Sequence, residues 1–174
     1  LLKQLATITG VQKDRVQLKR IGERLPQLPA ELRSSLVIEE ILLALEDGLR
    51  RSGGHLSDVW SQTPAESLLK ERIQSAVECV KDSGRSVSER LTALRVLSFG
   101  DVSTVRLATV GLLTTSHPPE IQTAAVRTLS AYQDESTAQT LLAAFPSSTP
   151  AVQYEIIEAL ASHTQRLPAL FDAI

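Results

Sequence analysis

Apolar and polar positions follow the same pattern three times in the C-terminal half of the chain, over residues 86–117, 118–149 and 150–174. When the copies are aligned with a shift of about 31 or 32 residues, apolar positions coincide in three sets: Ala93, Ala125 and Ile156; Leu94, Val126 and Ile157; Leu97, Leu129 and Leu160. A period of this length is typical of helix pairs that stack in a row.

Each copy predicts a first helix, a short turn and a second helix. The first helices are expected at about 87–98, 119–131 and 150–161, and the second at about 102–114, 135–145 and 164–173. Ser86 and Glu89 form a capping-box pattern, and Asp101 and Asp134 can cap second helices. Because such short helices cannot bury their apolar faces alone, we predict an all-α fold: a right-handed α-α superhelix of paired antiparallel helices.

Residues 1–85 predict an irregular helical segment that continues into the repeats as one domain. A helix tail ends at Gly10, and Leu18, Ile21, Gly22 and Leu25 form the apolar stripe of the next helix. The longest helix is expected at about 30–51, with apolar residues around most of its circumference, and Ser52-Gly53-Gly54 ends it. A loop with His55 and Trp60 follows, and Thr63-Pro64 begins a helix that ends at Asp82-Ser83-Gly84.

Composition narrows the classes of partner. The net charge is −2 with a pI near 6.0, so no overall basic field attracts nucleic acid. A single cysteine excludes an internal disulfide framework, and no apolar run is long enough to insert into a membrane. The chain begins with Leu1-Leu2 and contains no Met, so we expect it to be a fragment of a larger protein.

No residues form a pattern that predicts a catalytic, cofactor-binding or metal site. Cys79 lies in an apolar helix stripe and is interpreted as a buried small hydrophobe, the alternative being a reactive thiol. The histidines at 55, 117 and 163 are scattered, and His117 at a helix start is interpreted as a polar cap. The basic run from Lys13 to Arg24 is interpreted as a solvated helix face, because Asp14 and Glu23 dilute it.

A partner surface is the remaining candidate. Trp60 either packs over a gap in the fold or is an exposed anchor, since Trp is enriched among interface hot spots. Four polar residues of the repeats are candidates for the same surface: Gln122, Arg127, Gln153 and Glu158. The partner would be a protein or a neighbouring domain of the same polypeptide.

The repeats resemble HEAT repeats, which form armadillo-like solenoids. The segments that carry this resemblance are Ala93-Leu94-Arg95-Val96-Leu97 and Ala125-Val126-Arg127-Thr128-Leu129. Residues 121–174 in particular resemble the helical-repeat segment of large planctomycete-type proteins described as membrane-bound dehydrogenases. The resemblance implies an exported parent with a β-propeller before the repeats and a c-type haem domain after them. The haem motif Cys-x-x-Cys-His is absent here, since Val80, Lys81 and Asp82 follow Cys79, so the resemblance implies no cofactor in this segment.

These observations predict a non-catalytic helical-repeat scaffold or protein-interaction module inside a larger exported, redox-active protein. One alternative is an enzyme on a HEAT-like scaffold, such as a DNA glycosylase or a pigment lyase, which a basic groove with aromatic residues would support. Another is an architectural spacer between domains, which differs only in having no partner outside its own chain.

Overall fold

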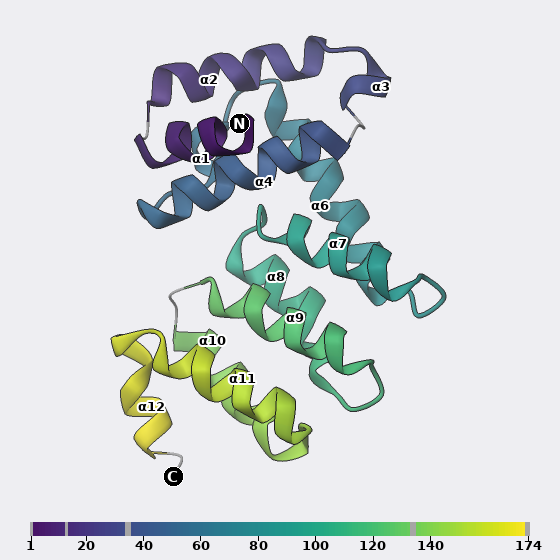
Figure 1. Ribbon diagram of the computed structural model, residues 1–174, viewed down its shortest axis with the longest axis vertical. Coiled ribbons are helices and arrows are strands. Elements are labelled where there is room, and N and C mark those ends of the chain that lie inside the picture. Colours follow the sequence, from purple (N-terminus) through teal and green to yellow (C-terminus); the bar gives the residue numbers. More distant parts are fainter. Residues whose placement is uncertain (1, 13, 34–35, 133–134, 173–174) are drawn as a thin grey trace. The chain divides into compact units, whose positions relative to one another are not determined.

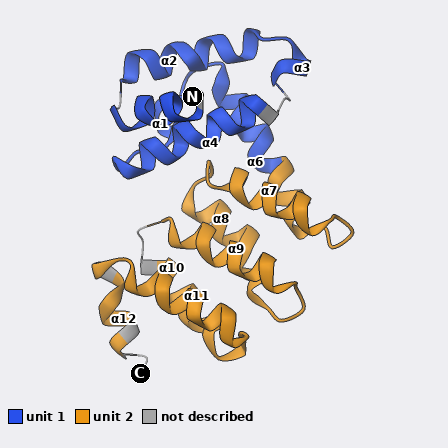
Figure 2. Ribbon diagram, viewed as in Figure 1, with its two compact units in different colours: residues 1–74 blue, residues 75–174 orange. Residues whose placement is uncertain are grey.

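The computed structural model describes residues 2–12, 14–33, 36–132 and 135–172 (Figure 1). Over these residues the chain forms α-helices and short 3-10 turns and contains no β-strand, which confirms the all-α prediction. The chain divides into two compact units, residues 1–74 and 75–174 (Figure 2). The sequence placed the change from irregular helices to repeats at 85/86 within one domain. The division between the units falls inside α6 (Ala65–Lys81). Arg72 in this helix donates a hydrogen bond to the Arg33 carbonyl of unit 1, whereas the Val80 carbonyl near its end accepts one from Arg90 of unit 2.

In unit 1, α1 (Leu2–Gln12) packs closely along α4 (Leu36–Arg51). The crossing has a glycine on each helix, and a Cβ atom built on Gly48 would lie 2.2 Å from the Thr7 carbonyl oxygen. The backbones of α1 and α4 therefore approach as closely as only glycine permits.

Helix α2 (Arg15–Arg24) follows α1 and is capped by Asp14, whose carboxylate accepts hydrogen bonds from the amides of Val16 and Gln17.

The segment predicted as the longest helix contains two helices, α3 (Ala30–Arg33) and α4, and residues 34–35 lie outside the described part. Helix α4 has 16 residues and α6 has 17, so α6 is the longest helix described. The apolar residues around α4 predict burial on several sides, but neighbours do not bury the whole helix, because Val37 is exposed while Leu42, Leu45 and Leu49 are buried. Gly53 has φ 74° and the Gly54 amide donates to the Leu49 carbonyl, so the glycines end α4 as predicted.

The remaining elements of unit 1 are short. Pro26 lies in the 3-10 turn η1 (Leu25–Gln27) that follows α2. The predicted loop around His55 contains a single helical turn, α5 (Leu56–Val59), directly before Trp60.

Unit 2 contains the three repeats. Their first helices are α7 (Val87–Leu97), α9 (Pro119–Ser130) and α11 (Pro150–Ala161), and α9 lies between the other two and packs on both (Figure 1). The second helices are α8 (Val102–Thr109), α10 (Glu135–Ala144) and α12 (Leu167–Asp172). The 3-10 turns η2 (Val110–Leu113) and η3 (Phe145–Ser147) follow α8 and α10, and η4 (Thr164–Arg166) precedes α12.

Two of the predicted helix caps are present. Ser86 and Glu89 form a complete capping box at the start of α7, and the Asp101 carboxylate accepts a hydrogen bond from the Thr104 amide at the start of α8. Hydrogen bonds from the Ser86 hydroxyl and amide hold the pKa of Glu89 below its ordinary value. Asp134, a further predicted cap, lies outside the described residues. Local chemistry thus fixes where these helices begin.

Buried polar side chains join each helix pair of unit 2 to the element before it. Arg90 donates through Nε and Nη2 to the Val80 carbonyl at the end of α6, at 3.1 and 2.9 Å. The Tyr132 hydroxyl donates to the Gly100 carbonyl beyond α7, at 2.8 Å. Arg166 donates to the Ser130 carbonyl at 3.0 Å and to the Tyr132 carbonyl. Each side chain satisfies carbonyls that a helix end leaves without a helical partner.

Candidate functional site

Trp60 lies in the core of unit 1, so the exposed-anchor alternative is wrong. Its side chain is 1% exposed, and its indole Nε1 donates a hydrogen bond of 2.8 Å to the Leu18 carbonyl in α2. A Cβ atom on Gly22 would lie 2.7 Å from the indole Cδ1, so the ring rests on the glycine of the α2 stripe. The ring therefore fills the space that this glycine leaves.

The prediction that Gln122 belongs to the partner surface is also wrong, because its side chain is only 1% exposed. Its side-chain amide donates to the His117 carbonyl, and Gln153, one repeat later, donates in the same way to the Phe145 carbonyl at 3.0 Å. Gln153 is half-buried. Both glutamines satisfy a carbonyl at the joint between repeats, which requires them to point into the fold.

Arg127 and Glu158 are exposed, as predicted for a partner surface. The Arg127 guanidinium reaches from α9 to Glu155 in α11, with Nε 2.6 Å from Oε1 and Nη2 2.9 Å from Oε2. This two-bond arrangement raises the pKa of Arg127 above its ordinary value. The pair joins neighbouring first helices on their solvent side, in the geometry that arginine and a carboxylate favour.

The apolar face of α11 is open where the equivalent faces of the earlier first helices are covered. Leu94 in α7 is 1% exposed and Val126 in α9 is 0% exposed, whereas Ile157 at the same repeat position in α11 is 42% exposed. Tyr154, one turn earlier, is 67% exposed. Helices α7 and α9 are each followed by another first helix that covers them, and α11 has no such neighbour within the described residues.

A buried carboxylate organises the turn after α4. Glu46 is buried, and its Oε2 accepts a hydrogen bond of 2.8 Å from the Leu56 amide. Its Oε1 lies 2.7 Å from His55 Nδ1, and this hydrogen bond raises the pKa of His55 above its ordinary value. Both carboxylate oxygens are engaged at the start of α5, so the pair stabilises a chain turn, and sequence reasoning did not find it.

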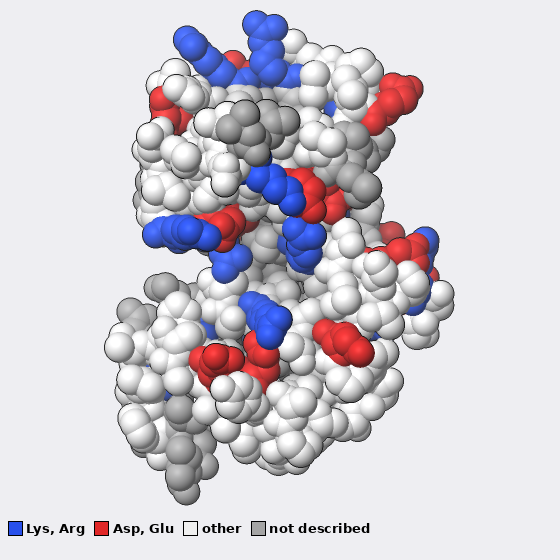
Figure 3. Space-filling view, viewed as in Figure 1, with Lys and Arg blue, Asp and Glu red and all other residues white. Residues whose placement is uncertain are grey.

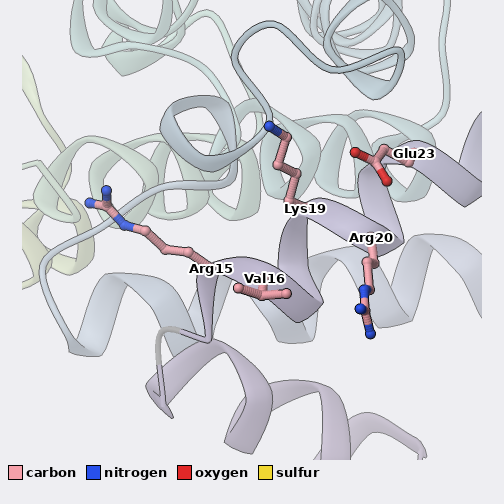
Figure 4. A pocket seen from close by; sticks show the side chains of 5 residues that line it. All are labelled: Arg15, Val16, Lys19, Arg20 and Glu23. Carbon is pink, nitrogen blue, oxygen red and sulfur yellow. The ribbon is translucent and has the colours of Figure 1, made fainter.

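The basic run lies on the exposed face of α2. Arg15, Lys19 and Arg20 line an open hollow together with Val16 and Glu23, but their charged ends point in different directions (Figure 4). Figure 3 shows Lys and Arg side chains along the α2 edge of unit 1, and both signs of charge intermixed over unit 2. The basic groups do not converge on one point, which is the geometry of a solvated helix face. Lys13 lies outside the described residues.

Cys79 and His117, the other candidate chemical groups, lie in different surroundings from those that the sequence predicted. Cys79 is half-buried, so it is more accessible than the sequence predicted. Pro118 takes the capping position predicted for His117, and His117 Nδ1 instead lies 3.3 Å from Arg90 Nη2. Across the described residues no three His, Cys, Asp or Glu side chains are grouped as metal ligands.

Among the helices that the structure describes, each is too short or too polar to cross a lipid bilayer. Comparison with protein-family models, with curated proteins and with solved structures gave no match.

Proposed function

We propose that this chain is a non-catalytic helical-repeat scaffold that binds a protein partner or neighbouring domains of its own polypeptide. In this proposal unit 2 is a right-handed α-α superhelix of the HEAT or armadillo-like kind, made of three equivalent helix pairs. We also propose, from the sequence resemblance alone, that the scaffold belongs to an exported parent of the planctomycete-type membrane-bound dehydrogenase family.

The observation that supports the scaffold best is the contrast between inward and outward positions of the first helices. The inward positions Leu97, Leu129 and Leu160 are the same residue and are fully buried. The outward positions, which are all exposed, change from basic to acidic along the stack: Arg95, Arg127 and Glu158. Arg127 also joins the repeats through Glu155, but the row as a whole presents charges of both signs to solvent, and charges placed in this way can select a complementary partner surface.

Exposed apolar residues favour a partner over a simple spacer. Leu107 and Val110 are exposed at the end of the first repeat, and Tyr154 and Ile157 are exposed on α11. The two residues of each pair are three positions apart in the sequence, so they are neighbours on one helical face. Exposed apolar groups of this kind mark protein contacts when they form a patch.

A cross-linking experiment tests the proposed function. A photoreactive amino acid replaces Arg95 or Arg127 in the polypeptide as its host produces it, and Lys81 is replaced in a matched control. We expect cross-links from the outward row to one partner or neighbouring domain, and few from Lys81. Equal or absent cross-linking at all three positions would contradict the scaffold proposal. Sequencing the flanking reading frame for a propeller and a Cys-x-x-Cys-His motif tests the family separately.

A further inference from the structure

Helix α2 has four exposed cations: Arg15, Lys19, Arg20 and Arg24. None of them forms an ion pair within the described part of the chain. Glu23 lies four residues after Lys19 and three after Arg20, where side chains on a helix meet, and it pairs with neither over the described residues. Other helices do pair their charges at this spacing: Lys70 with Glu66, and Arg51 with Asp47. The cations of α2 are therefore available to another molecule.

The placement of these cations works against the helix itself. Arg15 is the first residue of α2, where the helix dipole disfavours a positive charge, and the first turn has no acidic residue. Arg15 and Lys19 are like charges four residues apart, and so are Arg20 and Arg24, which destabilises a helix. Only Arg24, in the last turn, is favoured by the dipole. A partner that brings negative charge to α2 accounts for this pattern, whereas helix stability does not.

The cations lie on both sides of an exposed apolar side chain. Residues four apart share one side of a helix, so Arg15 and Lys19 form one row and Arg20 and Arg24 form a second. Val16, which is 63% exposed, lies between the rows and lines an open hollow with Arg15, Lys19 and Arg20. Lys19 and Arg20 extend in opposite directions (Figure 4). The hollow does not enclose a single phosphate, but it can receive a segment that covers Val16 and reaches both rows with carboxylates.

The same face favours an acidic protein over a polyphosphate. Glu23 is exposed and lines the hollow, so it would repel a phosphate there. Nucleic acid and anionic membranes present phosphates in close succession, whereas a protein segment can leave the position opposite Glu23 without a negative charge. Helix α2 contains no aromatic residue on which a base could stack, and one exposed valine is too little apolar surface to anchor a helix in a membrane.

The polarity of the face also distinguishes a separate protein from a further repeat. Repeats stack through apolar positions, as Leu94 and Val126 do in unit 2, and permanent interfaces are more hydrophobic than transient ones. The exposed face of α2 offers one apolar residue among charges, so a stacked repeat would bury unpaired cations there. Charged surfaces instead determine how fast and how selectively two proteins associate. The face suits a partner that binds and dissociates.

We propose that the exposed face of α2 binds an acidic segment of a separate protein, which places an apolar side chain over Val16 and carboxylates beside Lys19 and Arg20. This inference rests on the proposed scaffold function, to which it adds the chemical class of one partner. The complex is held by several exposed ion pairs, so it is reversible and sensitive to salt.

A matched pair of peptides tests the proposal. Both carry a fluorophore and a central leucine, and one has glutamates on either side of the leucine where the other has glutamines. Binding to the polypeptide as its host produces it is measured by fluorescence anisotropy, at low salt and at physiological salt. We expect the glutamate peptide to bind about tenfold more tightly at low salt and to lose most of this advantage at physiological salt, because each exposed ion pair contributes little and is screened.

Variants of the polypeptide separate binding from folding. Lys19→Gln combined with Arg20→Gln should weaken the glutamate peptide about fivefold, because two ion pairs are lost. The same variant should keep or raise the midpoint of thermal unfolding, because the repulsion by Arg15 and Arg24 is relieved. Lys70→Gln is the control, since Lys70 is an exposed cation of unit 1 that pairs with Glu66, and binding should be unchanged. A lower midpoint in the double variant would show that these cations stabilise the fold, and would overturn the proposal.

Other outcomes would also overturn it. Equal binding of the two peptides, or binding of neither, would exclude an acidic partner at α2. Tighter binding of a single-stranded oligonucleotide, or of phosphatidylserine vesicles, than of the glutamate peptide would identify the face as a phosphate-binding surface. A photoreactive residue in place of Val16 that captures a segment of the same polypeptide would show an intramolecular contact. Cross-linking at Arg95 and Arg127 decides the scaffold function independently of these results.

Discussion

The crossing of α1 and α4 makes unit 1 sensitive to one added methyl group. In Gly48→Ala, the new Cβ would lie 2.2 Å from the Thr7 carbonyl oxygen and 3.0 Å from the Gly10 Cα. These are backbone atoms, so no side-chain rotation relieves the contact. The helices must separate by roughly 1 Å, and overpacking of this kind costs about 1–3 kcal/mol.

The helix propensity of alanine acts in the opposite direction. Replacing an interior glycine with alanine stabilises a helix by up to about 1 kcal/mol. Because the clash is with backbone, the packing cost should lie at its upper end, and we expect Gly48→Ala to destabilise unit 1 by about 2 kcal/mol. Gly111→Ala is the control, since a Cβ atom there has no atom within 4 Å and no strained φ.

Urea denaturation measures this effect in unit 1 alone. Trp60 is the only tryptophan of the chain and is buried in unit 1, so its fluorescence follows the unfolding of that unit. We expect the fluorescence midpoint to fall in Gly48→Ala and to stay unchanged in Gly111→Ala. A midpoint that is unchanged or higher in Gly48→Ala would refute the close crossing of α1 and α4.

Three further predictions concern single interactions. Trp60→Phe removes the bond to the Leu18 carbonyl and should cost about 1–2 kcal/mol by circular dichroism, with an unchanged midpoint contradicting the bond. The pKa of His55 is raised by Glu46, so its stabilisation is complete below the unfolded pKa and is lost as pH rises through the higher folded pKa. The unfolding midpoint should therefore fall above about pH 6.5, and Glu46→Gln should flatten that dependence. Arg127→Ala should cost less than about 1 kcal/mol, and less still in high salt, because the guanidinium is exposed; a larger, salt-independent loss would contradict this.

The helices of unit 2 were predictable because their signals are local. The spacing of apolar residues identified all three first helices to within a residue or so at each end, and Ser86 and Asp101 marked two helix starts through their own caps. The ends of the second helices were predicted less accurately, since a 3-10 turn adjoins each of them: η2 and η3 follow α8 and α10, and η4 precedes α12. Periodicity does not separate the two helix types over a single turn.

The polar residues of the candidate site were harder to place. Gln122 and Gln153 were assigned to the surface because they are polar, but each satisfies a carbonyl at a joint between repeats. Arg90 and Arg166 also donate to carbonyls at helix ends, and both are buried although arginine is usually exposed. Which carbonyl each of these four side chains binds depends on which helix end lies close to it. That proximity is set by packing between segments that are distant in the sequence.

The central claim is that unit 2 is a row of equivalent helix pairs in which α7 and α9 are covered by the next first helix and α11, over the described residues, presents an open face. Thermal unfolding of Val126→Asp and Ile157→Asp tests it most directly, because the same change is made at the same repeat position. We expect Val126→Asp to unfold unit 2, since a buried unpaired charge costs at least about 4 kcal/mol, and Ile157→Asp to shift stability by less than about 1 kcal/mol. Equal effects of the two substitutions would show either that Val126 is not buried or that the face of α11 is not open, and would contradict the account.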